Sequence, residues 1–89
     1  MNLTLPVKTE YFNEILSGAK KYEYRLYNKY WKKRIHGKDF KTVTITKGYP
    51  KREDESRRIV RPYSGYKIKI IKHPHFGNRE VMVFAIKVN

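Results

Sequence analysis

A chain of 89 residues has room for one domain, and its 39% of apolar residues can form one shallow core. The aromatic share of 15% favours a folded chain over an intrinsically disordered one. With no cysteine, the sequence excludes disulfides, thiolate metal sites and a cysteine nucleophile, and its three histidines show no metal-ligand spacing. We therefore expect a single domain over residues 1–89 with no metal and no cofactor.

The hydropathy of the chain argues against a membrane partner. No apolar run approaches the roughly 18–20 residues of a transmembrane helix, and no basic segment has the clean apolar face of a membrane-surface helix. The first residues, Met1 to Pro6, lack the apolar core of a secretory signal. The sequence therefore predicts a cytoplasmic protein that does not contact membranes.

The start of the chain predicts a strand followed by a helix. Apolar residues alternate from Leu3 to Val7, which favours a strand. Apolar residues at helical spacing then predict a helix over residues 10–17. Thr9 is its expected N-cap, and Gly18 is the expected glycine just beyond its last turn.

The next segment predicts a tyrosine-rich strand and a second, shorter helix. The strand covers residues 21–27, and Asn28 can then cap a helix that Gly37 ends. Trp31 and Ile35 are four residues apart and share one face of this helix. We expect this pair to pack in the core rather than to serve as a platform for bases.

The second half predicts four strands, over residues 41–47, 57–61, 66–72 and 81–88. Tyr66, Ile68 and Ile70 alternate with lysines, so the third of these strands has one apolar and one basic face. The last strand is apolar on both sides, as a central strand is. Residues 51–58 are almost wholly charged and predict an exposed, mobile loop.

These elements add up to an α+β fold of five or six short, mostly antiparallel strands with two short flanking helices. No strand–helix–strand repeat runs through the chain, so a doubly wound parallel sheet is not expected. Closing short strands into a small β-barrel removes their exposed edges. The sequence therefore favours a curled or closed sheet.

The charge of the chain points to a polyanionic partner. The net charge is +13 at pH 7, and basic residues interleave with aromatic ones between Lys20 and Arg34. This pattern suits single-stranded nucleic acid, because cations follow the backbone while rings stack on bases. RNA is the expected partner, whether single-stranded or structured, and DNA is the alternative. The candidate binding residues are Lys20, Glu23, Arg25, Tyr27, Lys29, Lys32, Arg57 and Arg58.

Residues 18–25 carry a compact motif, G-x-K-x-x-E-x-R. The motif resembles the signature of the ASCH (activating signal cointegrator homology) domain family, and the flanking segments are similar over nearly the whole chain. The resemblance implies a PUA-like β-barrel, named after pseudouridine synthase and archaeosine transglycosylase, with helices around an RNA-binding cleft. It implies that Lys20, Glu23 and Arg25 face this cleft.

Strand alternation supports part of this site independently. Glu23 and Arg25 are two residues apart, so they share one face of a strand and can form an ion pair. That pair can line a cleft or simply hold the fold together, and both readings are open at this point. We expect Tyr22 and Tyr24 to face the core and Tyr27 to lie near the cleft.

Two other classes of function stay open: an enzyme, with either of two reactions, and a surface that binds an acidic protein. Some ASCH relatives are hydrolases that act on acetylated cytidine, and the resemblance then implies catalytic roles for Lys20 and Glu23, although Glu23 replaces the threonine of those relatives. The third member of that catalytic set has no certain counterpart here. A ribonuclease is the other enzymatic option, with acid–base groups drawn from His36, His73 and His75. An acidic protein surface is the non-enzymatic alternative, and the oligomeric state is open.

Overall fold

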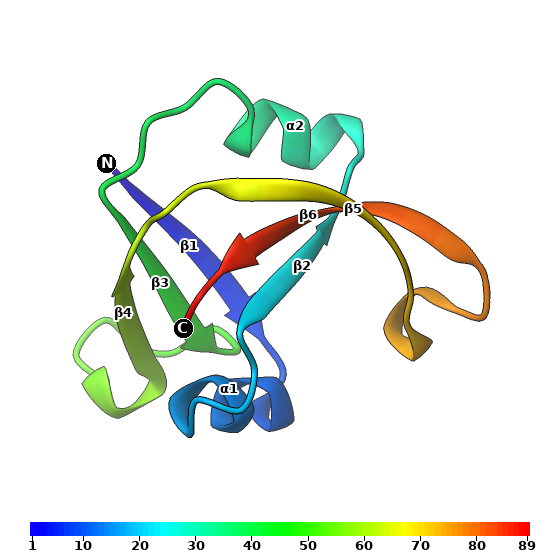
Figure 1. The fold of residues 1–89 in the computed structure, drawn as a ribbon. Coiled ribbons are helices and arrows are strands. Elements are labelled where there is room, and N and C mark those ends of the chain that lie inside the picture. Colours follow the sequence, from blue (N-terminus) through cyan, green and yellow to red (C-terminus); the bar gives the residue numbers. More distant parts are fainter.

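The computed structural model describes residues 1–89 and shows an α+β fold of six strands and two α-helices (Figure 1). The elements are β1 (Asn2–Val7), α1 (Thr9–Leu16), β2 (Tyr22–Leu26), α2 (Lys29–Ile35), β3 (Thr42–Lys47), β4 (Arg58–Pro62), β5 (Tyr66–Lys72) and β6 (Glu80–Lys87). Short 3-10 turns cover Glu55–Arg57 and Pro74–Phe76. None of the helices is long and apolar enough to cross a bilayer.

The strands form two separate three-stranded sheets. One sheet has the order β1-β3-β4 and the other has the order β2-β6-β5. The β1–β3 pair is parallel, and the other three pairs are antiparallel. The predicted α+β class with mostly antiparallel strands is confirmed, but backbone hydrogen bonds do not close the six strands into one barrel. Figure 1 shows α1 and α2 at opposite ends of the two sheets.

The core lies between the sheets and draws on almost every element. Its largest fully buried side chains are Phe12, Phe84, Leu5, Ile15, Ile35, Ile45, Ile86, Val43, Val83 and Val88. β6 is the central strand of its sheet, and all residues from Val83 to Ile86 are fully buried. This confirms the prediction of a final strand that is covered on both faces. Trp31 is only partly buried but packs against the core, while Ile35 is fully buried within it.

The helix ends agree with the sequence at three of four positions. Gly18 has φ +85° and follows α1, and Asn28 caps α2 by accepting a hydrogen bond from the Trp31 amide at 3.0 Å. Gly37 follows α2 with φ +70°. The expectation for Thr9 is wrong: Lys8 is the N-cap of α1 and makes no side-chain capping bond. β1 runs to Val7, so a single extended residue separates strand from helix and Thr9 is already helical.

The tyrosines of β2 face the opposite way from the expectation. Glu23 and Arg25 pair with Ile86 and Phe84 of β6 and lie on the inner face, whereas Tyr22 and Tyr24 lie on the other face and are half-buried. Tyr27 packs on Phe84 at a ring-centroid distance of 4.9 Å. The error has a physical cause. β6 is buried on both faces, so the polarity of β2 alone cannot tell which of its faces is covered.

The far end of β5 is also less buried than its alternation predicts. Tyr66 packs against the core, but Ile68 and Ile70 are 43% and 63% exposed. Ile68 pairs with Phe84 of β6, and Ile70 pairs with Met82, just beyond the residues of β6 that pair with β2. Figure 1 shows that the β5–β6 hairpin extends past β2. An apolar face is therefore present without a layer to cover it.

The charged loop is exposed, as predicted, but it is tied to β4. Arg58 is the first residue of β4 and donates through Nη1 to the carbonyl oxygens of Lys51 and Asp54, both at 2.8 Å. A 3-10 turn over Glu55–Arg57 joins the loop to the strand. One arginine thus holds the loop against the strand that follows it.

Candidate nucleic-acid interface

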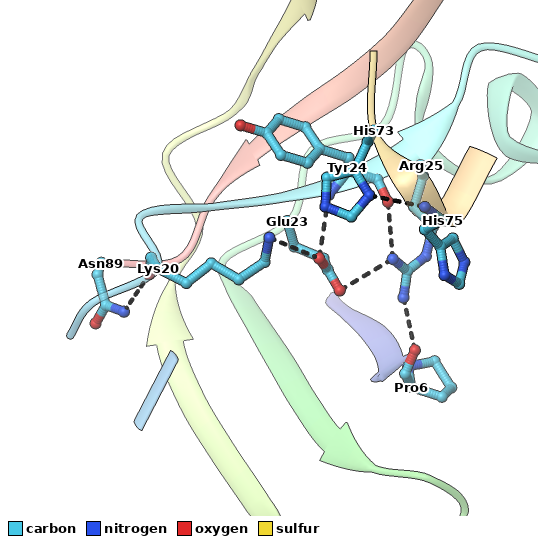
Figure 2. Close-up of polar contacts among 8 residues, drawn as sticks. All are labelled: Pro6, Lys20, Glu23, Tyr24, Arg25, His73, His75 and Asn89. Carbon is cyan, nitrogen blue, oxygen red and sulfur yellow. Dashed lines mark hydrogen bonds and ion pairs between the residues drawn. The ribbon is translucent and has the colours of Figure 1, made fainter. Parts of the chain in front are cut away.

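Three side chains of the motif meet in one ion cluster (Figure 2). Glu23 is only 5% exposed. Its Oε2 lies 3.1 Å from Arg25 Nη1, and its Oε1 lies 3.6 Å from Lys20 Nζ. Two cations therefore flank one buried carboxylate. Such a carboxylate is stable only while its partners remain, because an unpaired buried charge is costly.

Arg25 also connects the two sheets. Its Nη1 donates to the carbonyl oxygen of Tyr24 at 2.9 Å, and its Nη2 donates to the carbonyl oxygen of Pro6 at 2.7 Å. Pro6 belongs to β1 and Arg25 to β2, which lie in different sheets. The guanidinium carbon lies 5.3 Å from the centroid of the Trp31 ring. Three of the five N–H donors of Arg25 are thus engaged within the protein, which leaves two for a ligand.

Lys20 is positioned by a residue far away in the sequence. Asn89 donates through Nδ2 to the carbonyl oxygens of Ile15 and Lys20, both at 2.8 Å (Figure 2 shows the Lys20 bond). The Lys20 ammonium lies 5.3 Å from the Tyr11 ring centroid and 4.9 Å from that of Tyr24. Two rings and a carboxylate therefore surround the ammonium, so cation–π contacts and an ion pair hold it in place.

Tyr11 stands next to this cluster. Burial raises the pKa of its phenol above 10.0, and the negative charges of Glu10, Glu23 and Glu14 raise it further. The phenol therefore stays protonated at neutral pH and remains a hydrogen-bond donor as well as an acceptor. Tyr11 thus adds an uncharged polar group to the charged residues around it.

An open cleft of about 1560 Å³ runs over this cluster and across both sheets. The volume exceeds the roughly 300–1,000 Å³ of most small-molecule pockets, so the cleft can hold an extended ligand. Seven of its lining residues are cationic and one is acidic. The cations are Lys8, Lys20, Arg25, Lys33, Arg34, Lys38 and Arg58, and the one carboxylate is that of Glu23. Their excess of positive charge favours an anionic ligand.

The structure separates the candidate binding residues into two groups. Lys20, Glu23, Arg25 and Arg58 line the cleft, although Arg58 is also engaged with the charged loop. Tyr27, Lys29, Lys32 and Arg57 do not line it. The Lys32 ammonium stacks on Tyr27 at 4.3 Å, and Arg57 pairs with Asp54 at 3.2 Å.

The three histidines also differ in whether they line the cleft. His73 and His75 line the cleft, whereas His36 is exposed at the end of α2. Residues 73–75 are not extended: His75 lies in a 3-10 turn, and its amide donates to His73 Nδ1 at 3.1 Å. This bond makes Nδ1 an acceptor and places the ring proton on Nε2. His73 Nδ1 is therefore occupied by a local backbone contact.

Sequence reasoning missed several cleft residues. On α2, Trp31 and Arg34 both line the cleft, and their three-residue spacing is a helical signal for a shared face. Lys8 and Tyr49 come from short connections after β1 and β3, where no periodic pattern exists to place them. Asn89 does not line the cleft but positions Lys20, and no sequence signal marks it because Lys20 is 69 positions away.

The described side chains offer no obvious metal centre, since no group of three or more histidine or acidic residues gathers as ligands do. No protein-family model, curated protein or solved structure matches the chain. The geometry and charge of the cleft are therefore the structural guide to its ligand.

Proposed function

We propose that this chain is an RNA-binding domain and that RNA occupies the cleft over Lys20, Glu23 and Arg25. One observation carries the proposal: seven cationic residues and a single carboxylate line one open cleft. Phosphate groups neutralise such an excess of charge and release counterions, which supplies affinity for any nucleic acid. A cytoplasmic location, as expected from the sequence, fits this role.

Exposed rings in the same cleft support a ligand with bases as well as phosphates. Tyr30 is 56% exposed and lies beside Arg34, whose guanidinium carbon is 4.4 Å from its ring centroid. A ring beside a cation can contact a base and its phosphate together. The choice of RNA over DNA rests on the resemblance of residues 18–25 to the ASCH motif.

The proposal extends to the architecture. We regard the two sheets as the two sides of a PUA-like barrel whose seam is bridged by a side chain rather than by backbone pairing. The bond from Arg25 to the Pro6 carbonyl oxygen supports this view, because it joins the edge strand of one sheet to a strand of the other.

The binding proposal is tested by fluorescence anisotropy with a labelled single-stranded RNA over a series of salt concentrations. The double variant Lys33→Glu/Lys38→Glu reverses two charges in the cleft, and Lys67→Glu/Lys87→Glu reverses two exposed charges outside it. We expect the cleft variant to weaken binding strongly and to flatten the salt dependence by about 0.7 in slope per lost phosphate contact. Equal losses of RNA affinity in the two double variants would show that only the net charge matters. That result would contradict the proposal that RNA binds in the cleft.

A hydrolase is the second candidate, and the approach of Lys20 Nζ to Glu23 Oε1 at 3.6 Å favours it. A lysine beside a carboxylate can exchange protons while water adds to an acyl carbon and the C–N bond breaks. The test is mass spectrometry of acetylated cytidine and of total RNA incubated with the wild type, Lys20→Ala and Glu23→Gln. Turnover that both variants abolish would establish an enzyme. Intact substrates with the wild type would exclude these two reactions.

A further inference from the structure

Tyr49 is the most exposed large apolar side chain of the molecule. It is 92% exposed and lies in the turn that leaves β3, between Gly48 and Pro50. At this exposure the ring buries almost no area and therefore adds little to folding. It is free to contact a ligand.

The backbone on both sides of Tyr49 is held in place. The Gly48 amide donates to the Val7 carbonyl oxygen at 2.9 Å, and the buried Thr46 hydroxyl donates to the Gly48 carbonyl oxygen at 2.8 Å. Gly48 has φ +64°, which a residue with a side chain rarely adopts. Beyond the turn, Arg58 Nη2 donates to the Pro50 carbonyl oxygen at 3.5 Å.

This combination of a fixed backbone and an exposed ring is what a stacking residue needs. A tyrosine has only two side-chain torsions to order when it binds. If the backbone is already ordered, little further entropy is lost on contact with a flat partner. The turn therefore presents a ring that is ready to bind.

Tyr49 lines two neighbouring hollows, and both of them have cationic lining residues. Tyr49 lines the large cleft and also a smaller hollow that adjoins it, which contains Lys8, Lys47 and Arg57 and has no acidic lining residue. A chain that leaves the cleft past Tyr49 would meet these three cations next. A flat aromatic group with an anion attached to it matches this surface, and a nucleotide is such a group.

We propose that Tyr49 is a stacking platform for an unpaired base of single-stranded RNA, with Lys8 and Lys47 placed for the neighbouring phosphates. The inference rests on the proposed RNA-binding function and specifies which structural form of RNA the domain binds. Bases inside a duplex are already stacked on both faces, so a duplex offers Tyr49 no free face within its length. The ligand class is therefore a single strand or an unpaired loop.

The test measures the affinity of three probes: a short oligouridylate, an abasic oligomer with the same number of phosphates, and a blunt RNA duplex. For Tyr49→Ala we expect oligouridylate affinity to fall between about 5-fold and about 150-fold, the range for loss of one stacked base. Affinity for the abasic oligomer and for the duplex is expected to stay unchanged. Tyr49→Phe keeps the ring and should bind as the wild type does, whereas Tyr49→Leu should resemble Tyr49→Ala.

The outcomes separate this inference from the function on which it rests. Wild-type binding to oligouridylate that Tyr49→Ala leaves intact overturns the stacking role and leaves the RNA-binding proposal standing. An equal loss for the abasic oligomer also overturns it, because that probe has no base to stack. Failure of the wild type to bind any of the probes overturns both. Urea unfolding midpoints should be equal for all variants, since the ring is 92% exposed.

Discussion

Arg25 Nη2 lies 2.7 Å from the carbonyl oxygen of Pro6, and this hydrogen bond joins two sheets that share no backbone pairing. The same guanidinium holds the buried Glu23 carboxylate through Nη1 at 3.1 Å. A side chain at the floor of the cleft is therefore also part of the connection between the sheets. The Glu23–Arg25 pair can therefore stabilise the fold and line the cleft at the same time, and these two roles do not exclude each other.

Replacing Arg25 should destabilise the fold strongly. Arg25→Ala removes the link to Pro6 and leaves Glu23 with Lys20 as its remaining charged partner. Breaking a buried ion pair from one side costs about 3 kcal/mol, which is a large part of the stability of a small domain. Urea unfolding followed by circular dichroism measures the change.

Arg79→Ala is the matched control for this experiment. Arg79 is exposed, and no ion pair or side-chain hydrogen bond of the described residues involves it. Exposed sites of this kind change the free energy of unfolding by less than about 0.5 kcal/mol. Equal unfolding midpoints for Arg25→Ala and Arg79→Ala would show that the Arg25 contacts contribute nothing to stability.

Gly18 should resist substitution because of its backbone and not because of crowding. Its φ is +85°, and an added Cβ would meet no atom within 4 Å. Gly18→Ala should therefore cost about 1 kcal/mol through conformation alone, and Gly18→Asn should cost less because asparagine tolerates a positive φ. This explanation is supported if the urea unfolding midpoint is highest for the wild type, lower for Gly18→Asn and lowest for Gly18→Ala. An alanine variant as stable as the wild type contradicts it.

The sequence was sufficient to predict the features of the fold and site that depend only on residues close together in the chain. Gly18 and Asn28 were predicted correctly because helix ends depend on a few neighbouring residues. The contact of Glu23 with Arg25 was predicted because strand alternation fixes the relation of residues two apart. These predictions needed no knowledge of which elements pack together.

The remaining parts depend on contacts between distant segments. The core-facing side of β2 was predicted the wrong way round, because a central strand that is buried on both faces gives its neighbour no preferred side. Asn89 reaches Lys20 and Arg25 reaches Pro6 only after the sheets have come together. The predicted barrel closure likewise depended on which strand edges meet, and the edges of the two sheets do not pair.

Two isoleucines in strands should respond very differently to truncation. Ile45 of β3 is fully buried, whereas Ile70 of β5 is 63% exposed. Ile45→Ala should lower the free energy of unfolding by about 2–5 kcal/mol, because it removes packed atoms and leaves a cavity. Ile70→Ala should change it by less than about 0.5 kcal/mol. A comparable loss at Ile70 would mean that a further layer covers the end of the β5–β6 hairpin in solution.

The stability of the domain should fall in alkaline solution, and Tyr11 and Tyr63 are two of the residues responsible. Burial raises the pKa of Tyr11 above 10.0, with Glu10, Glu23 and Glu14 adding to the shift. Burial, followed by the effect of Tyr66, raises the pKa of Tyr63. In the unfolded chain both phenols ionise near pH 10, so between that pH and the raised values the unfolded state has released protons that the folded state still holds.

The stabilising contribution of these two phenols is thus complete below about pH 10 and is lost as the pH rises through their raised pKa values. Tyr11→Phe and Tyr63→Phe have no phenol to ionise, so each should flatten the alkaline decline of the urea unfolding midpoint. Each should also remove part of the late rise in phenolate absorbance in a spectroscopic titration. Glu23→Gln should lower the pKa of Tyr11, because it removes one of the charges that raise it. Alkaline declines of equal slope in the wild type and both phenylalanine variants would contradict the assignment to these two residues.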